Sequence, residues 1–286
     1  MPTPDTYLLY FLVVFLVCVG AGLLGSLVGL GGGIFVVPLL TLIFHVPFPV
    51  AAGASIVSVI ATSSGAAAAY VRDHIVNLRV GMFLEVATTI GALCGAFLVT
   101  LLPPGILFVL FGLVLLAAML PSLAKLGEEL PQHVHNDALS ERLALAGSYP
   151  DPQLHRVVRY NVTRVPLGFG IMYVAGALSG LLGIGSGPFK VLALDSAMRL
   201  PMKVSTTTSN FMIGVTAAAS AGLYFARGDI NPLIATPVAL GVLCGAMIGA
   251  RTLSRFSNTT LKKVFLLVLA IFAINMLVRG IATLLG

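Results

Sequence analysis

Long apolar segments, separated by short polar ones, run along the whole chain. In the first half they cover about 7–28, 34–45, 50–70, 79–101 and 104–122; after a polar stretch at 123–164 they cover about 165–182, 188–199, 204–226, 232–254 and 259–282. A helix that spans a bilayer needs about 20 apolar residues, and most of these segments supply them. The second segment of each half is too short for an upright span. The pattern predicts an all-α integral membrane protein with about five helical segments in each half.

The two halves form an internal sequence repeat with one constant offset. Residues 154 positions apart match without a gap, so that Phe35 aligns with Phe189 and "GALCGA" at 91–96 aligns with "GAMIGA" at 245–250. A constant offset of this kind is typical of a repeat architecture. Asn77 and Asn231 also align, and each is placed to cap the fourth segment of its half. Further matching pairs are Gly29/Gly183, Gly31/Gly185, Gly33/Gly187, Ser55/Ser209, Thr62/Thr216 and Tyr70/Tyr224.

The lysines and arginines predict the orientation in the membrane. If all ten segments cross and the N-terminus is outside, the inside receives 13 of the 16 basic residues, namely Arg72, Arg79, Lys125, Arg142, Arg156, Arg159, Arg164, Arg199, Lys203, Arg251, Arg255, Lys262 and Lys263. If the short segments are re-entrant instead, the basic residues divide more evenly, and residues 199–203 lie on the side opposite to 123–164. The positive-inside rule favours the first arrangement. Because five is an odd number, the repeats at 1–122 and 165–286 are then inverted, as in many secondary transporters, and 123–164 is a cytoplasmic linker.

The composition excludes an ordinary soluble domain. Of the 286 residues, 58% are hydrophobic and 9% are charged, whereas about a quarter of the residues in soluble domains are charged. The net charge of +6 lies mostly in the loops, which indicates topology, and we expect no nucleic-acid partner. The N-terminal run has no basic start and continues past signal-peptide length, so we expect a retained span in the inner membrane. Cys18, Cys94 and Cys244 have no metal-binding spacing, and we expect no metal and no cofactor.

Two glycine clusters, "GLGGGIF" at 29–35 and "GIGSGPF" at 183–189, follow the first segment of each half. Glycine adopts conformations that break helices, and irregular backbone inside a membrane is tolerated where it is buried in protein or lines a cavity. The helix that restarts after each break has free N–H groups and a positive dipole end, which favour an anion. The alternative is that the glycines only allow close helix packing. The candidate residues for an anion site near the midplane are Gly31, Gly32, Gly33, Gly185, Ser186 and Gly187.

The sequence around these clusters resembles the TauE/SafE family of membrane permeases. "GLLGSLVGLGGGIFVVPLL" at 22–40 is similar to the first-repeat motif of that family, and "AGALSGLLGIGSGPFKVLAL" at 175–194 is similar to the second. The chain departs from the pattern where Leu192 stands as the counterpart of Pro38. The resemblance covers both repeats and implies transport of small sulfur-containing anions such as sulfite, sulfoacetate or thiosulfate.

Polar residues within the apolar segments are further candidates. The third segments contain Ser55, its partner Ser209, and Asn210. These neutral donors can hold an anion, and the alternative is that they bond to their own or a neighbouring helix. Lys190 follows the second glycine cluster, where its counterpart is Val36. It either complements an anionic cargo or extends to the membrane interface.

Acidic and histidine residues complete the candidates. Glu85 in the fourth segment aligns with Ala239; it either carries a coupling proton or pairs with loop arginines. Asp195 and Arg199 are four residues apart, which is typical of a pair at a helix end. In the linker, His133 and His135 form only a weak metal motif, and residues 136–147 predict a short capped helix.

Together these features predict a secondary transporter that exports a small anion. An anion channel could use the same architecture without alternating access. An intramembrane enzyme is the third alternative, but the sequence has no HExxH motif, no GxSxG motif with a His/Asp set, and no paired intramembrane aspartates.

Overall fold

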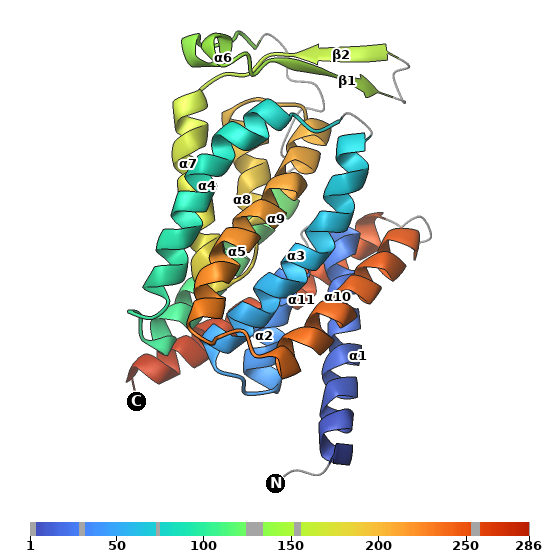
Figure 1. The fold of residues 1–286 in the computed structure, drawn as a ribbon, viewed down its shortest axis with the longest axis vertical. Coiled ribbons are helices and arrows are strands. Elements are labelled where there is room, and N and C mark those ends of the chain that lie inside the picture. Colours follow the sequence, from blue (N-terminus) through green and yellow to red (C-terminus); the bar gives the residue numbers. More distant parts are fainter. Residues whose placement is uncertain are drawn as a thin grey trace.

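The computed structural model describes residues 4–28, 32–72, 75–123, 134–151, 156–252 and 258–285, and helices make up most of them (Figure 1). The first half consists of α1 (Pro4–Val28), α2 (Gly33–Pro38), the π-helical turn η1 (Leu39–Ile43), α3 (Phe48–Arg72), α4 (Leu78–Leu98) and α5 (Pro104–Leu123). The linker contributes α6 (Ala138–Arg142), β1 (Gly147–Asp151) and β2 (Arg156–Tyr160). The second half consists of α7 (Val165–Leu182), α8 (Gly187–Leu192), the π-helical turn η2 (Ala193–Ala197), α9 (Met202–Ala226), α10 (Pro232–Thr252) and α11 (Asn258–Leu285).

The sequence repeat is also a repeat of structure. The bounds of α2, η1, α3 and α4 recur 154 residues later as those of α8, η2, α9 and α10. Asn77 accepts a hydrogen bond from the Val80 N–H at 3.0 Å, and Asn231 accepts one from the Leu233 N–H at 3.0 Å. Both predicted caps are therefore confirmed, and each satisfies an N–H that the helix itself leaves without a partner.

The main helix pairs of the bundle follow the repeat: each pair either has an equivalent pair in which the two halves have swapped roles, or joins a helix to its own counterpart. The α1 helix packs on α10 and α7 packs on α4, which are the same pair with the halves reversed. The α3 helix packs on its own counterpart α9, and α5 packs on its counterpart α11. Each half therefore completes the other, because the first helix of one half finds its main partner in the other half.

Hydrogen bonds near the helix ends show which segments lie at the same end of the bundle. At the linker end, the Asn77 N–H donates to the Thr208 hydroxyl at 3.1 Å, and the Thr163 N–H donates to the Met198 carbonyl at 3.3 Å. At the far end, Arg227 donates to the carbonyl of Ala96, where α4 finishes. Residues 198–203 thus lie at the same end as the linker. An arrangement with five crossings in each half places these residues and the linker on one side, and the crossings themselves stay a prediction.

Helix directions follow from the same contacts. In Figure 1, α1 starts at the N-terminus at the bottom of the view and runs up, whereas α7 starts below the β-hairpin at the top and runs down. Helices long and apolar enough to cross a membrane are Tyr7–Gly25, Leu78–Leu98, Val165–Leu182, Pro232–Gly249 and Leu266–Leu285. Shorter apolar stretches are Gly33–Ile43, Phe48–Ser64 and Pro104–Met119. The protein is therefore an all-α multi-pass membrane protein; ten crossings and inversion relative to the bilayer remain predictions.

Glycines allow the backbones of α4 and α7 to touch. A Cβ atom on Gly91 or Gly95 would overlap the backbone of α7, at the carbonyls of Tyr173 and Ala177 respectively. A Cβ on Gly176 would likewise overlap the carbonyl of Thr88. Small residues between membrane helices let the helix backbones approach closely. Such close packing stabilises the helix pair in lipid, where the hydrophobic effect does not drive helices together.

The linker forms a cap over one end of the bundle, with a hairpin that the sequence pattern did not predict. Asp137 caps α6 by accepting from the Ser140 N–H at 2.7 Å, but α6 ends at Arg142, earlier than the predicted 147. The Asn77 amide donates to Leu145 O and to the Tyr160 hydroxyl, both at 2.9 Å. Burial raises the pKa of Tyr160 to about 12, so its phenol keeps its proton at physiological pH. His133 lies outside the described residues.

The first prediction concerns the glycine contacts. Gly176→Ala is expected to lower the free energy of unfolding by about 1–3 kcal/mol, because the added methyl group forces α4 and α7 apart. Gly170→Ala on the same helix is the matched control, because a Cβ there meets nothing within 4 Å. Thermal unfolding of the purified protein measures both variants, and equal midpoints would show that this contact has no part in stability.

The second prediction concerns orientation. Ser148 in the linker hairpin and Thr100 at the far end are both exposed. Cysteines are placed at either position after Cys94 and Cys244 are replaced by serine. A membrane-impermeant thiol reagent should label Thr100→Cys in intact cells, but Ser148→Cys only after permeabilisation. Labelling of Ser148→Cys in intact cells would contradict a cytoplasmic linker.

Candidate functional site

The second helix break separates α7 from α8 at residues 183–186. Gly183 and Gly185 have φ values of +71° and +75°, and Ser186 has φ of +48°. These values lie in the left-handed region, which glycine adopts freely and serine rarely. The break that the glycines predict is therefore present, and it holds Ser186 in an unfavourable backbone conformation.

The first glycine cluster is described from Gly32 onward, and Gly31 lies outside the described residues. Gly32 precedes α2 with φ of −65°, and Gly33 is the first residue of α2. A Cβ on Gly33 would lie 2.5 Å from Val59 Cγ2, and a Cβ on Gly32 would overlap the side chain of Val242. These two glycines thus allow α2 to pack closely on neighbouring helices. Close packing was the alternative to an anion site in the sequence analysis.

Ser55 on α3 contacts both the start of α2 and the second break. Its hydroxyl lies 2.6 Å from the carbonyl oxygen of Gly183 and 3.2 Å from that of Gly33, and its single proton serves one of them at a time. In the other half, Ser209 donates to the carbonyl of Gly187 at 3.3 Å. Both serines therefore bond to the backbone at the breaks, as the alternative interpretation of the third-segment hydroxyls held.

Lys190 is buried in the interior after the second break. Its side chain is 0% exposed. The ammonium donates to the Met212 carbonyl at 3.2 Å and to the Thr216 hydroxyl at 2.5 Å, both on α9. The lysine therefore does not extend to the membrane interface, and a positive charge lies inside the bundle one helical turn beyond Ser186.

Glu85 on α4 is the acidic residue to which Lys190 is linked by hydrogen bonds. The Thr216 hydroxyl accepts from Lys190 and donates to Glu85 Oε1 at 2.6 Å, so threonine bridges ammonium and carboxylate. The Thr89 hydroxyl lies 3.3 Å from the same oxygen. Arg79 donates instead to the Ala144 carbonyl at 3.1 Å. Arg79, the arginine nearest to Glu85 in sequence, is therefore engaged elsewhere. Lys190, Thr216 and Glu85 form one hydrogen-bonded chain, named the charged chain below.

Several hydrogen-bonding positions around the charged chain are unfilled. Glu85 Oε2 and Ser186 Oγ are buried and have no hydrogen-bond partner among the described residues. An ammonium group has three N–H donors, and within the described part of the chain Lys190 finds the two acceptors named above. Buried polar groups are normally satisfied, so an unfilled set needs an explanation such as a bound ion or water.

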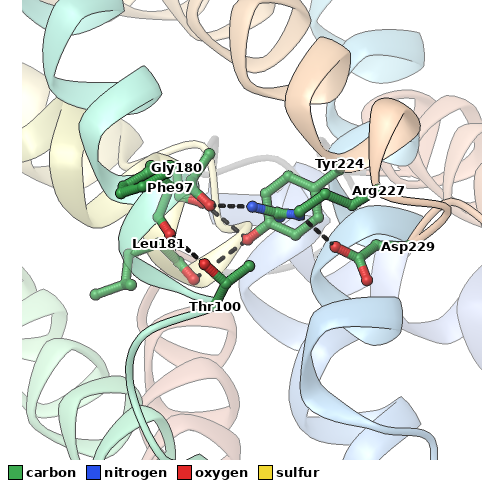
Figure 2. A network of polar contacts seen from close by, with 8 residues as sticks. Phe97, Thr100, Gly180, Leu181, Tyr224, Arg227 and Asp229 are labelled. Carbon is green, nitrogen blue, oxygen red and sulfur yellow. Dashed lines mark hydrogen bonds and ion pairs between the residues drawn. The ribbon is translucent and has the colours of Figure 1, made fainter.

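Tyr224 fixes the end of α7 immediately before the second break (Figure 2). The Tyr224 hydroxyl donates to the Gly180 carbonyl at 2.9 Å and lies 3.4 Å from that of Leu181. These carbonyls belong to the last turn of α7, where the helix leaves them without a partner. The position of the break is therefore held from α9, the helix that also carries Thr216.

Arg227 extends this network across the far end of the bundle. Its guanidinium stacks over the Tyr224 ring, 4.6 Å from the centroid, and its Nε lies 2.8 Å from Asp229 Oδ2. It also donates to the Ala96 carbonyl. Figure 2 shows these side chains converging from α9 and the α9–α10 loop onto the ends of α4 and α7. The sequence analysis considered Tyr224 only as one of a repeated pair and assigned no role to Arg227.

The remaining candidates lie outside these contacts. Asn210 is half-buried on α9 and takes no part in the hydrogen bonds described above. Asp195 is buried in η2, and Arg199 follows the turn with φ of +60°. Of the candidates, the structure therefore brings Lys190 and Glu85 together through Thr216, and Ser186 lies one helical turn before Lys190.

Comparisons with known proteins agree with a membrane transporter. The family described as "Sulfite exporter TauE/SafE" matches residues 14–276. The "Probable membrane transporter protein YdhB" of Bacillus subtilis is 28% identical over 272 residues, which cover 94% of this chain and 100% of the relative. "Probable membrane transporter protein YunE" of the same organism is 27% identical over 91% of this chain and 95% of its own length.

A third relative, a "Probable membrane transporter protein" of Xylella fastidiosa, is 29% identical over 94% of this chain and 97% of its own length. No solved structure matches the chain. Since the family match extends over nearly the whole chain, both repeats included, the protein is a multi-pass membrane transporter and belongs to the TauE/SafE family.

Proposed function

We propose that this transporter is a secondary transporter that exports small sulfur-containing anions, such as sulfite or organosulfonates, across the inner membrane. The observation that carries the proposal is the fully buried ammonium of Lys190, which lies one turn after the second helix break. A cation in a low-dielectric interior attracts an anion far more strongly than a surface lysine does. The sulfur chemistry rests on the family description and not on the geometry.

Alternating access is supported by the repeat. We take the two halves to be inverted repeats, because matching helices recur at one offset and pack on the partners of their counterparts. In such folds the substrate site lies at the interface of the repeats, where helices are discontinuous. The α3 and α9 helices meet there, and the charged chain joins α8 and α9 of one half to α4 of the other.

A channel and an enzyme are the competing functions. A channel would pass anions at a rate that keeps rising with concentration, whereas a transporter saturates at its turnover rate. An enzyme would form a product. Flux into proteoliposomes, measured for sulfite, a sulfonate, thiosulfate and a carboxylate, separates all three functions and identifies the class of anion. Saturable flux of the sulfur anions with no product is the expected result, and preference for the carboxylate would overturn the proposed substrate class.

The third prediction concerns Lys190. Lys190→Met keeps most of the side-chain volume but removes the charge, and it is expected to weaken anion binding by about tenfold or more, since one charged hydrogen bond contributes about 1.5–3 kcal/mol. Lys203→Met removes an exposed lysine at the start of α9 and serves as the control. The apparent Km of sulfite flux measures both variants. An unchanged Km in Lys190→Met would show that the buried charge does not hold the anion.

The fourth prediction concerns the bridge. Thr216→Val deletes the hydroxyl between two buried charged groups and is expected to lower the free energy of unfolding by about 1–3 kcal/mol. Its repeat counterpart, Thr62→Val, is the matched control, because among the described residues the Thr62 hydroxyl bonds to carbonyls of its own helix, those of Ser58 and Val59. The control should change stability by about 0.5 kcal/mol or less. Equal losses in thermal unfolding would indicate that the bridge is no more than a helix back-bond.

A further inference from the structure

The charged chain has no counterpart at the position related to it by the repeat. The repeat counterparts of Lys190 and Glu85 are Val36 and Ala239, so that position has no charge. Thr216 reaches the charged groups as well as the Met212 carbonyl of its own helix, whereas its counterpart Thr62 bonds to the Ser58 and Val59 carbonyls of its own helix. The helices are therefore repeated in the two halves, whereas the pair of opposite charges, Lys190 and Glu85, occurs once.

Charges other than Lys190 do not reach the Glu85 carboxylate in the described structure. On its own helix, Arg79 is bonded to Ala144 O. Packed against α4 are α7, α9 and the linker. The titratable groups of α7, α9 and η2 are engaged elsewhere or stand away from the carboxylate: Tyr173, which lies beside Cys94, Lys203 and Arg227 near the two ends of α9, Tyr224 on the α7 carbonyls, and Asp195 in η2. On the described linker, Tyr160 bonds to Asn77, Tyr149 lies against Tyr160 and Asp137 caps α6, whereas His135, Glu141, Arg142, Arg156, Arg159 and Arg164 are exposed.

Charge balance in this interior allows one anion beside Lys190. With Glu85 ionised, the lysine and the glutamate cancel, and the buried site has no net charge. A monoanion that enters next to the ammonium would leave one uncompensated negative charge in a low-dielectric environment, which is strongly unfavourable. A proton on Glu85 restores the balance, since the site then contains one cation, one anion and one neutral acid.

The unfilled hydrogen-bonding positions fit the same account. Lys190 has a third N–H, and Ser186 Oγ has no partner among the described residues; both can donate to an anion. Glu85 Oε2, also without a partner there, can only accept while it is ionised and so repels an anion. Once protonated, the carboxyl group becomes a donor. Protonation therefore turns the one repulsive group at the site into an attractive one.

We propose that binding of the anion at Lys190 requires protonation of Glu85, so that one proton accompanies each monoanion through the protein. The proton comes from water on the side where the anion enters, adds to the Glu85 carboxylate, and leaves from the same oxygen when the anion is released. Transport of a monoanion is then electroneutral, and its direction follows the gradients of anion and proton, outward where the anion accumulates inside. This inference rests on the proposed anion-transport function.

The test counts protons with methanesulfonate as the probe. A sulfonate stays ionised across the useful pH range, so it does not carry protons itself. Titration calorimetry of the purified protein in two buffers of different ionisation enthalpy gives the number of protons taken up per anion bound. The measurement is made above the pH range in which Glu85 is protonated in the free protein. There the expected number is one for the wild type, and the affinity falls by up to about tenfold for each further pH unit.

Two variants identify the group that takes up the proton. Glu85→Gln, a neutral mimic of the protonated acid, should bind methanesulfonate with no proton uptake and with a constant affinity over the pH range in which Lys190 of that variant keeps its proton. Glu141→Gln removes an exposed glutamate of α6 and is the matched control, expected to behave as the wild type. Proton uptake that persists in Glu85→Gln would overturn the assignment. If that variant does not fold, the wild-type proton count still decides, because a count of zero contradicts the proposal without any variant.

The outcomes also separate this inference from the function on which it rests. If the wild type binds neither methanesulfonate nor sulfite, the proposed anion transport is wrong, and the coupling is wrong with it. If the wild type binds and transports the sulfonate without proton uptake, anion transport stands and the coupling alone is overturned.

Discussion

An ammonium group inside a protein that is itself surrounded by lipid must have its charge compensated. At Lys190 the Met212 carbonyl and the Thr216 hydroxyl provide hydrogen bonds, and the Glu85 carboxylate, reached through Thr216, provides the opposite charge. Removing one partner of a buried pair leaves an uncompensated charge, which is far more unfavourable than never having had the pair. The packing of α4 and α9 at this level is therefore tied to the ionisation of two side chains.

The rest of the fold brings the side chains of Lys190, Thr216 and Glu85 together. Glycine contacts set α4 directly against α7, and the second break turns the chain back so that α8 runs beside α9. Tyr224 holds the last turn of α7, with Arg227 stacked over its ring. A nearly symmetric scaffold thereby presents an asymmetric charge pair.

The sequence predicted the features that depend on local pattern. Helical segments, the repeat, the short second helices and the caps at Asn77 and Asn231 follow from hydrophobic length, a constant offset and side-chain chemistry near in sequence. The partnership of Lys190 with Glu85 does not, because the two residues belong to different halves and meet only through packing. The linker hairpin has strands of five residues with no clear alternation, and its register depends on contacts such as that of Tyr160 with Asn77.

The claim that Lys190 holds the transported anion is tested most directly by locating a bound anion. A structure of the protein with 2-bromoethanesulfonate, in which anomalous scattering marks the bromine, gives the position of the sulfonate without reference to activity. The account predicts sulfonate oxygens within hydrogen-bond distance of Lys190 Nζ and Ser186 Oγ. A sulfonate bound elsewhere, with Lys190 still bonded to Met212 and to the Thr216–Glu85 bridge, would contradict it.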